Sequence, residues 1–158
     1  MDLPLITRFI DKRSGGRVPG FIGIATDQDL LRWTAWRYRP ADEDRTWDWW
    51  EIYLDCKKVA GRYQCYAARA MGDLQGLMLL DVKTRKTRVG KAITVDYLAT
   101  NPANREPNHG LKCVGVALMT TAVASSVECN AGGVIQLESL PGAARFYESL
   151  GMSRQPGR

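Results

Sequence analysis

The sequence predicts an α/β fold in which a mixed β-sheet lies between two layers of helices, a three-layer αβα arrangement. Segments 63–70, 74–82 and 92–100 have strand-like composition and follow one another across turns, as in an antiparallel meander. A helical segment, 115–129, then separates the third strand from an apolar strand at 134–137. A crossover of this kind makes the two strands parallel, so the predicted sheet is mixed.

The N-terminal part of the chain alternates between short apolar segments and turn residues. Residues 3–10 alternate weakly in hydrophobicity and are predicted to form an opening strand. The stretch 14–20 contains three glycines and a proline, and we expect a loop with no packed element there. Residues 21–25 are short and apolar and lead into the first helix.

Two amphipathic helices are expected between these segments and the meander. Thr26 or Asp27 can cap the first helix, and Pro40 ends it at the latest. The acidic run 42–44 is predicted to start the second helix, and the lysines at 57–58 complement its C-terminal end.

Five tryptophans fall between residues 33 and 50. Core packing of the two helices explains most of them, and the alternative is a stacking platform for bases or for a flat substrate. Trp49 lies on the opposite side of the predicted helix from Trp47 and Ile52. We therefore expect Trp49 to face a cleft or a partner.

The crossover helix 115–129 is predicted to pack on the sheet. Val116, Met119, Val123 and Val127 recur at helical spacing and form its apolar face, with Leu118 and Ala122 beside it. This is the face that we expect to be buried against the strands.

Length and composition fit one globular domain, predicted over residues 1–158. A chain of this size buries about 70% of its unfolded surface. The apolar fraction of 45% and the charged fraction of 25% are globular values. No apolar run approaches the roughly 20 residues of a membrane span, and no signal-peptide pattern is recognisable. We therefore expect a cytoplasmic protein that makes no membrane contact.

The cysteines and the histidine give no metal-binding pattern. The four cysteines form no C-x-x-C pair, and the single histidine, His109, cannot complete a zinc site with them. Reduced thiols and no bound metal are predicted. Cys113 is expected to be a buried apolar residue, and the alternative is a reactive thiol in an anion-binding turn.

A net charge of +5 suits a polyanionic partner. Nucleic acid and coenzyme A are both polyanions. The densest basic run is 83–88, between two apolar strands. A solvated hairpin is the favoured interpretation of this run, and nucleic-acid binding is the less favoured one.

The stretch 112–117, between the third strand and the crossover helix, is predicted to bind an anion. The first N–H groups of a helix have no intrahelical acceptor and point to one region. The helix dipole adds partial positive charge there, and Lys112 adds a full one. Gly115 and Ala117 keep side-chain bulk away from an approaching phosphate. On spacing alone, a small-residue helix start packed on a strand would be the better interpretation.

Two motifs in the C-terminal part occur in an order and at a separation that is known from one family. Residues 112–117, KCVGVA, match the pattern (Q/R)-x-x-G-x-(G/A) apart from the lysine at its first position. Residues 146–152, FYESLGM, match F-Y-x-x-x-G-(F/M). The run from about 92 to 152 thereby resembles the GCN5-related N-acetyltransferases (GNAT), in which the first motif binds acetyl-CoA.

The resemblance implies the GNAT acyl-CoA N-acyltransferase fold, with an acetyl-CoA-binding core over residues 92–152. In that family the pantetheine arm pairs with the strand before the loop, which here means Leu98, Ala99 and Thr100. Ser139 would take the place of an asparagine that often binds this arm in the family. The pyrophosphate would be held at the anion-binding turn. The residues implied there are Lys112, Cys113, Val114, Gly115, Val116 and Ala117.

The resemblance also implies catalytic roles. Tyr147 matches a tyrosine that donates a proton to the departing sulfur, with packing in the core as the alternative. Asp96 matches a position at which a carboxylate activates the amine or a water, with a structural salt bridge as the alternative. Glu138 is the second candidate for the base, and His109 is expected to be solvated.

The predicted function is transfer of an acetyl group from acetyl-CoA to a primary amine. The acceptor remains open between a small amine, a protein terminus and an aminoacyl group on RNA. The alternative is a non-catalytic acyl-CoA-binding or RNA-binding module on the same fold. The family commonly adds one or two strands after the second motif, so a homodimer partner or the N-terminal strand is expected to cover that edge of the sheet.

Overall fold

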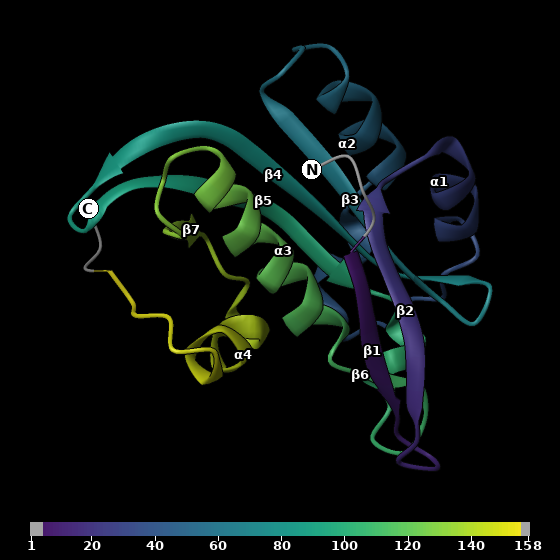
Figure 1. Cartoon of the computed structure of the whole chain (residues 1–158). Helices are drawn as coiled ribbons and strands as arrows, with labels where there is room; N and C mark the ends of the chain where they lie inside the picture. The colour runs from purple at the N-terminus through teal and green to yellow at the C-terminus, as the bar shows by residue number, and fades with distance from the viewer. Residues whose placement is uncertain (1–4, 156–158) are drawn as a thin grey trace.

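A seven-stranded sheet separates two layers of helices in the computed structural model, which describes residues 5–155 (Figure 1). The strands are β1 (Leu5–Asp11), β2 (Arg17–Ile24), β3 (Tyr63–Ala70), β4 (Asp73–Thr87), β5 (Gly90–Thr100), β6 (Leu111–Lys112) and β7 (Ile135–Leu137). The helices are α1 (Asp27–Trp33), α2 (Trp49–Cys56), α3 (Val114–Glu128) and α4 (Ala144–Ser149), with 3-10 turns η1 (Glu43–Thr46), η2 (Pro102–Arg105) and η3 (Pro141–Ala143).

The sheet has the mixed topology that the sequence predicts. Its strand order is β6-β1-β2-β3-β4-β5-β7, and β5 and β7 are adjacent and parallel. Ile93 lies opposite Ile135, and Val95 lies opposite Leu137. The other neighbouring strands are antiparallel. The fold class is confirmed, and α3 is the crossover that joins the two parallel strands.

Each face of the sheet has its own core. Phe9, Leu80, Ile93 and Leu118 are among the fully buried residues between the sheet and α3. A second cluster lies on the opposite face, under α1 and α2. It includes Leu30, Trp49, Leu74 and Leu77. The sheet is therefore covered on both sides, which makes the arrangement three-layered (Figure 1).

Strand β2 begins earlier than the glycines and proline suggest. The predicted loop 14–20 is wrong for residues 17–20, which pair with β1. Gly20 is required here by packing, because a Cβ atom at this position would lie 2.3 Å from Cε2 of Phe9. The ring of Phe9 thus lies directly on the backbone of its neighbouring strand. A glycine that reads as a loop signal is in fact a contact site of the core.

The first predicted helix is confirmed and the second is wrong at its start. The side chain of Thr26 caps α1 and forms a capping box with Asp29. Helix α2 begins only at Trp49, where Asp48 accepts a hydrogen bond from the N–H of Glu51 at 3.2 Å. The acidic run 42–44 does not start this helix. Two of its three carboxylates, those of Asp42 and Asp44, are buried instead.

Trp49 does not face a cleft or a partner. Its side chain is 0% exposed and packs edge-on against Trp47 and Tyr97, with ring centroids 6.3 and 6.0 Å away. The prediction placed Trp49 on a helix that started six or seven residues earlier. Because α2 starts at Trp49, this residue lies in the first turn of the helix, and its side chain belongs to the core.

The buried face of α3 also differs from the predicted one. Val116 and Val123 are each 40% exposed and Val127 is 57% exposed, whereas Val114, Leu118 and others contact the sheet. The buried face includes hydroxyl side chains that are hydrogen-bonded. Thr121 donates to the carbonyl of Ala117 at 3.0 Å, Ser126 donates to Val134 at 2.7 Å, and Ser125 is paired with Tyr66 at 3.3 Å. Such satisfied hydroxyls are compatible with burial. The prediction is right for Met119, Leu118 and Ala122, which are buried, and wrong for the three exposed valines.

The open end of the sheet is not covered by the N-terminal strand. Strand β1 lies near the other end of the sheet, between β6 and β2. In the range 5–155, β7 is an edge strand of three residues. The expectation that β1 might cover this edge is therefore wrong.

Candidate functional site

The strands β5 and β7 diverge after a short parallel contact. Their pairing ends at Val95 and Leu137, but β5 continues to Thr100 and stays paired with β4, where Leu98 lies opposite Met78. Within the described part of the chain, no strand pairs with β5 on its β7 side beyond Val95. The last residues of β5 thus form an open strand edge inside the fold.

Backbone alternation decides which residues face this open edge. The N–H of Asn101 donates to the carbonyl of Gln75 in β4 at 2.8 Å. In an antiparallel pair, alternate residues direct their N–H and C=O groups to the partner strand. Ala99 therefore pairs with β4, and the backbone groups of Leu98 and Thr100 face the open edge. Of the three residues predicted to pair with a ligand, Leu98 and Thr100 have backbone groups at the open edge, and Ala99 has none.

The predicted anion-binding turn is an uncapped helix N-terminus. Cys113 precedes α3 in the left-handed region (φ 74°), and no side chain caps the helix. The N–H of Ala117 donates to the carbonyl of Cys113 at 3.0 Å. The N–H groups of Val114, Gly115 and Val116 precede that first helical hydrogen bond and have no acceptor among residues 5–155. Three free donors remain, and the first turn contains no acidic residue.

Cys113 itself is exposed, so the expectation of a buried apolar residue is wrong. The left-handed conformation of its backbone turns the chain sharply from β6 into α3. This turn leaves the side chain in solvent at the end of the helix.

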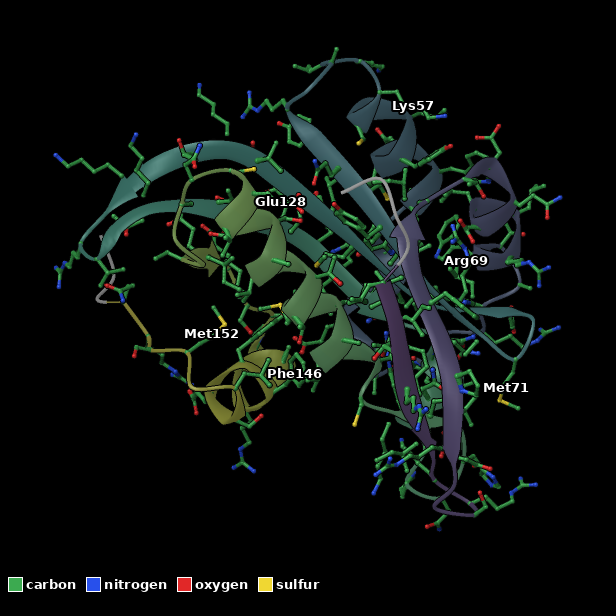
Figure 2. All side chains as sticks on the ribbon, in the orientation of Figure 1. Lys57, Arg69, Met71, Glu128, Phe146 and Met152 are labelled. Carbon is green, nitrogen blue, oxygen red and sulfur yellow. The ribbon has the colours of Figure 1, made fainter. Side chains whose placement is uncertain are left out.

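Two close contacts hold the start of α3, one against the sheet beside the end of β5 and one against α4. A Cβ atom on Gly76, which pairs with Thr100, would lie 3.0 Å from Cγ1 of Val114. A Cβ atom on Gly115 would lie 2.9 Å from Cζ of Phe146, which approaches α3 from α4 (Figure 2). The missing side chain of Gly115 thus makes room for Phe146 rather than for a ligand. The prediction that Gly115 keeps side-chain bulk away from a phosphate is therefore corrected, although the N–H of Gly115 remains free.

A second lysine lies near the turn, and no sequence motif indicates it. Lys112 is exposed on β6 and pairs with Ile10 of β1. Lys12 follows β1, and its ammonium donates to the carbonyls of Asn104 and, at 2.8 Å, of Glu106. Burial and the charge of Lys112 lower the pKa of Lys12. One hundred residues separate the two lysines, so only the pairing of β1 with β6 brings them together.

Tyr147 is half-buried on α4, next to Phe146 at a ring-centroid distance of 5.1 Å. Burial raises the pKa of its phenol above the usual 10, so the hydroxyl is protonated at neutral pH. The hydroxyl has no hydrogen-bond partner in the described range, and it is not sealed from solvent. A protonated, unengaged hydroxyl is a suitable proton donor.

Asp96 directly follows Val95, the last residue of β5 that pairs with β7. It is the extra residue of a β-bulge, because Tyr97 pairs with Leu79 and Val95 pairs with Leu80. Its side chain is exposed, and the predicted salt-bridge alternative has no ion pair to support it among residues 5–155.

The environment of Asp96 favours a carboxyl that takes up a proton more readily than usual. Partial desolvation and the nearby carboxylate of Asp81 raise its pKa, while Arg85 and Arg62 act in the opposite direction. Both arginines are ion-paired with Asp81, at 3.5 and 3.1 Å. Asp96 thus has the stronger basicity that a general base needs.

The remaining candidates, Glu138, Ser139 and His109, are exposed. Glu138 and Ser139 follow β7, and the Ser139 hydroxyl donates to the carbonyl of Leu140 at 2.7 Å. Nδ1 of His109 lies 2.8 Å from the guanidinium of Arg13 in the loop before β6. No hydrogen bond or ion pair joins any of these side chains to Tyr147 or Asp96 within the described residues.

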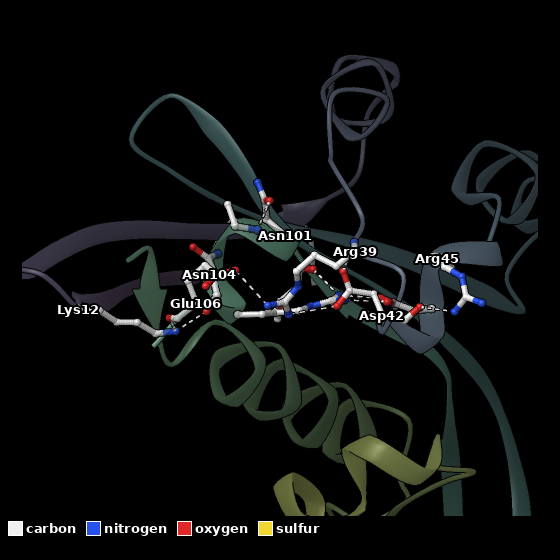
Figure 3. Close-up of polar contacts among 11 residues, drawn as sticks. Lys12, Arg39, Asp42, Arg45, Asn101, Asn104 and Glu106 are labelled. Atoms are coloured by element: carbon white, nitrogen blue, oxygen red, sulfur yellow. Dashed lines mark hydrogen bonds and ion pairs between the residues drawn. The ribbon is translucent and has the colours of Figure 1, made fainter. Parts of the chain in front are cut away.

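A buried ion network fixes the end of β5 and was missed by the sequence analysis (Figure 3). The guanidinium of Arg105 binds both carboxylate oxygens of Asp44, at 2.8 and 2.7 Å, and lies 3.1 Å from Asp42. The same group donates to the carbonyl of Thr100 at 2.8 Å. Thr100 therefore keeps only its N–H free at the open edge. The acidic run 42–44 serves this network instead of starting a helix.

Glu43, between the two buried aspartates, reaches across to the other side of the site. Its carboxylate accepts a hydrogen bond from the N–H of Gly142 in η3 at 2.5 Å. The turn η3 leads directly into α4, which bears Tyr147. The loop before α2 thus connects the end of β5, through Arg105, to the helix of the proposed acid.

We expect Arg105→Gln to lower the free energy of unfolding by about 3–5 kcal/mol, because it leaves the buried carboxylate of Asp44 without its ion-pair partner and that of Asp42 with Arg39 alone. Arg39→Gln removes a more exposed partner of Asp42 and should cost less than about 1 kcal/mol. Urea unfolding of both variants measures the difference. Adding Asp42→Asn and Asp44→Asn to Arg105→Gln should restore part of the loss, and equal stability of the two single variants would contradict the proposed network.

The network also predicts a pH dependence. Burial opposes ionisation of Asp42, but hydrogen bonds from Arg39 and Arg105 outweigh it and hold its pKa below the usual 3.8. A lowered folded-state pKa stabilises the protein above about pH 4, and this contribution disappears as the pH falls through the folded-state value. The acid limb of the stability curve should be less steep in Arg105→Gln.

Residues 5–155 contain no group of three or more His, Cys, Asp or Glu side chains that could hold a metal ion. None of their helices is long and apolar enough to cross a membrane. All four cysteines are free thiols.

Comparison with known proteins assigns the fold. No model of a known protein family matches the sequence, and no curated protein matches it significantly. Solved structures do match. A transcriptional regulator from Bacillus halodurans C-125 superposes with a TM-score of 0.66 at 19% identity, over 87% of this chain and 95% of that one.

Acetyltransferases are prominent among the matches. AAC(6')-Iy, in complex with a bisubstrate analogue containing CoA, has a TM-score of 0.64 at 12% identity, over 88% and 94% of the two chains. Ribosomal-protein-alanine N-acetyltransferase from Brucella melitensis biovar Abortus 2308 has a TM-score of 0.58 at 17% identity, over 88% and 95%. The chain thus has the fold of the GCN5-related N-acetyltransferases, as the motifs predict. This fold is typical of acetyl-CoA-dependent N-acetyltransferases.

Proposed function

We propose that the protein is an acetyl-CoA-dependent N-acetyltransferase that acts on a primary amine. The observation that carries the proposal is the open edge of β5, which ends beneath an uncapped helix N-terminus with three free N–H donors. An extended ligand with a negatively charged end fits this combination, because the edge can pair with its amides and the helix end can bind its phosphates. Acetyl-CoA has both features.

The residues present fit this ligand in their chemistry. Leu98 offers an N–H and a C=O at the edge, and Thr100 offers its N–H. Val114, Gly115 and Val116 supply N–H donors for the pyrophosphate, and Lys112 supplies a positive charge. When bound, acetyl-CoA provides an activated acetyl thioester. An N–H of the β5 edge would stabilise the negative charge that develops on the thioester oxygen.

Two side chains would handle the protons. Tyr147 donates its phenolic proton to the sulfur as the carbon–sulfur bond breaks. Asp96, whose pKa is raised by partial desolvation and by Asp81, accepts the proton that the amine loses as the carbon–nitrogen bond forms. A water between Asp96 and the amine would extend the reach of this short side chain. Holding both reactants together supplies much of the acceleration.

A screen of amine acceptors with thiol release as readout tests the proposal. Solved structures with the same fold include an aminoglycoside 6'-N-acetyltransferase, a glucosamine-6-phosphate N-acetyltransferase and a ribosomal-protein-alanine N-acetyltransferase. The first three probes are therefore an aminoglycoside, glucosamine 6-phosphate and a peptide with N-terminal alanine. We expect acetyl-CoA to bind and at least one primary amine to release free thiol. Tight binding of acetyl-CoA without thiol release from any amine would favour the alternative, a non-catalytic acyl-CoA-binding module.

A further inference from the structure

The hairpin of β4 and β5 extends beyond the rest of the sheet. Strand β3 ends its contact with β4 at Asp81 and Val82, and β7 pairs with β5 only from Ile93 onward. Residues 83–91 therefore form a two-stranded ribbon with no other strand at either edge in the described structure (Figure 1). We call residues 83–91 the basic arm. The favoured interpretation of the basic run 83–88, a solvated hairpin, is confirmed, because β4 continues to Thr87 and pairs with the start of β5.

The basic arm carries charge of one sign only. It contains no acidic and no aromatic residue. All of its cationic side chains are exposed, and they are Lys83, Arg85, Lys86, Arg88 and Lys91. Arg85 has an ion pair with Asp81, at 3.5 Å, and the other four have none within residues 5–155.

This charge does not help the arm to fold. Lys86 and Lys91 lie directly opposite each other in the β4–β5 register. Like charges in this position repel, which destabilises a hairpin. The hydroxyl of Thr87 donates to the carbonyl of Gly90 at 2.6 Å, so the turn is held without any contribution from the cations. Repulsion between the cations thus destabilises the arm in the isolated protein, and binding of an external polyanion would remove this repulsion.

We propose that the basic arm binds the sugar–phosphate backbone of a nucleic-acid duplex. Lys86 and Lys91 share one face of the ribbon, and Arg85, in the alternate position, points to the other. A two-stranded ribbon with cations on both faces suits a groove that has phosphates along both walls. The arm contains no aromatic side chain on which bases of a single strand would stack. Its one apolar tip residue, Val89, is too little for a membrane-binding face, which needs a continuous apolar surface.

This inference does not depend on the proposed acetyl transfer. None of the residues of the arm is assigned to the cofactor site or to catalysis. Affinity for coenzyme A, measured by calorimetry, should stay unchanged in variants of the arm. Failure of one proposal therefore leaves the other intact.

The test compares two charge-matched variants of the full chain. K86Q/R88Q/K91Q removes three cations from the arm, and R17Q/R37Q/K58Q removes three exposed cations elsewhere. Fluorescence anisotropy measures binding to labelled 20-base-pair RNA and DNA duplexes between about 50 and 200 mM salt. We expect the arm variant to bind about tenfold more weakly or worse, with a salt slope smaller by about 2.7, because each lost phosphate contact changes the slope by about 0.9. The control variant should keep its slope within about one unit.

Poly-L-glutamate, anionic phosphatidylserine vesicles and the single strand of equal length serve as competing probes. We expect each to bind more weakly than the duplex. An equal loss in the control variant would overturn the assignment to the arm. Equally tight binding of any competing probe would overturn the assignment to a duplex. Far-UV circular dichroism checks that both variants are folded, which is expected because their changed residues are exposed.

Discussion

Replacing Tyr147 by phenylalanine is expected to lower turnover about 100-fold or more on a verified amine acceptor, with little change in affinity for coenzyme A. The substitution removes the proposed proton donor and keeps the ring that packs against Phe146. Because the hydroxyl has no partner in the described range, its loss should leave the free energy of unfolding nearly unchanged. Steady-state kinetics and calorimetry together measure these effects.

Tyr63→Phe is the matched control. Tyr63 is also partly buried, but it lies at the start of β3, under the guanidinium of Arg62 and away from α4. We expect near-normal turnover from this variant. If Tyr147→Phe also retained near-normal turnover, Tyr147 would be a packing residue, as the alternative interpretation of the sequence holds.

Val116→Glu is expected to weaken binding of coenzyme A by about tenfold or more at low salt. The change places a carboxylate beside the free N–H groups where the pyrophosphate would bind, and the two negative charges repel. An acidic residue in the first turn of a helix is itself favourable, so the stability of the folded protein should not fall. The loss of affinity should shrink as salt is added, since ions screen the repulsion between exposed charges.

Val123→Glu provides the control for this experiment. Both valines are on α3 and both are 40% exposed, but Val123 lies two turns away from the helix N-terminus. Calorimetry should give normal affinity for this variant. Equal affinities of the two variants would mean that phosphate does not bind at the start of α3. Gly115→Glu would be a poorer test, because its side chain would collide with Phe146.

The part of the fold that the sequence predicts best is the unit from β5 through α3 to β7. Its elements are contiguous in the chain, and a glycine-bearing turn and an apolar strand mark their ends. A right-handed crossover leaves little choice of topology once the elements are placed. Local patterns are therefore sufficient here.

The errors arose where tertiary contacts outweigh local patterns. Asp42 and Asp44 look like a helix start, but Arg105, more than sixty residues away, buries them in an ion network. Nothing in their spacing indicates this partner. Gly20 resembles a loop residue in the sequence. Its contact with the ring of Phe9 exists only when β1 and β2 are paired, so the sequence alone does not reveal it.

The site shows the same division. The two motifs locate Tyr147 and the start of α3, since each is a short continuous stretch. Which backbone groups are free depends on the register with β4 and on the first hydrogen bond of α3. The motifs do not show these hydrogen bonds. The sequence-based prediction therefore included Ala99, whose backbone groups pair with β4, and Ala117, whose N–H donates to Cys113.

The loop from Arg39 to Thr46 limits how this protein could be redesigned for a new acceptor. A designer would exchange this loop first, because it borders the site on the side opposite α3. Asp42 and Asp44 would have to be kept as counterions of Arg105, and Glu43 would have to be kept as the acceptor for the N–H of Gly142. The freedom to vary is therefore confined to the exposed positions before and after these carboxylates, such as Ala41 and Thr46, whose side chains make no polar contact with the described residues.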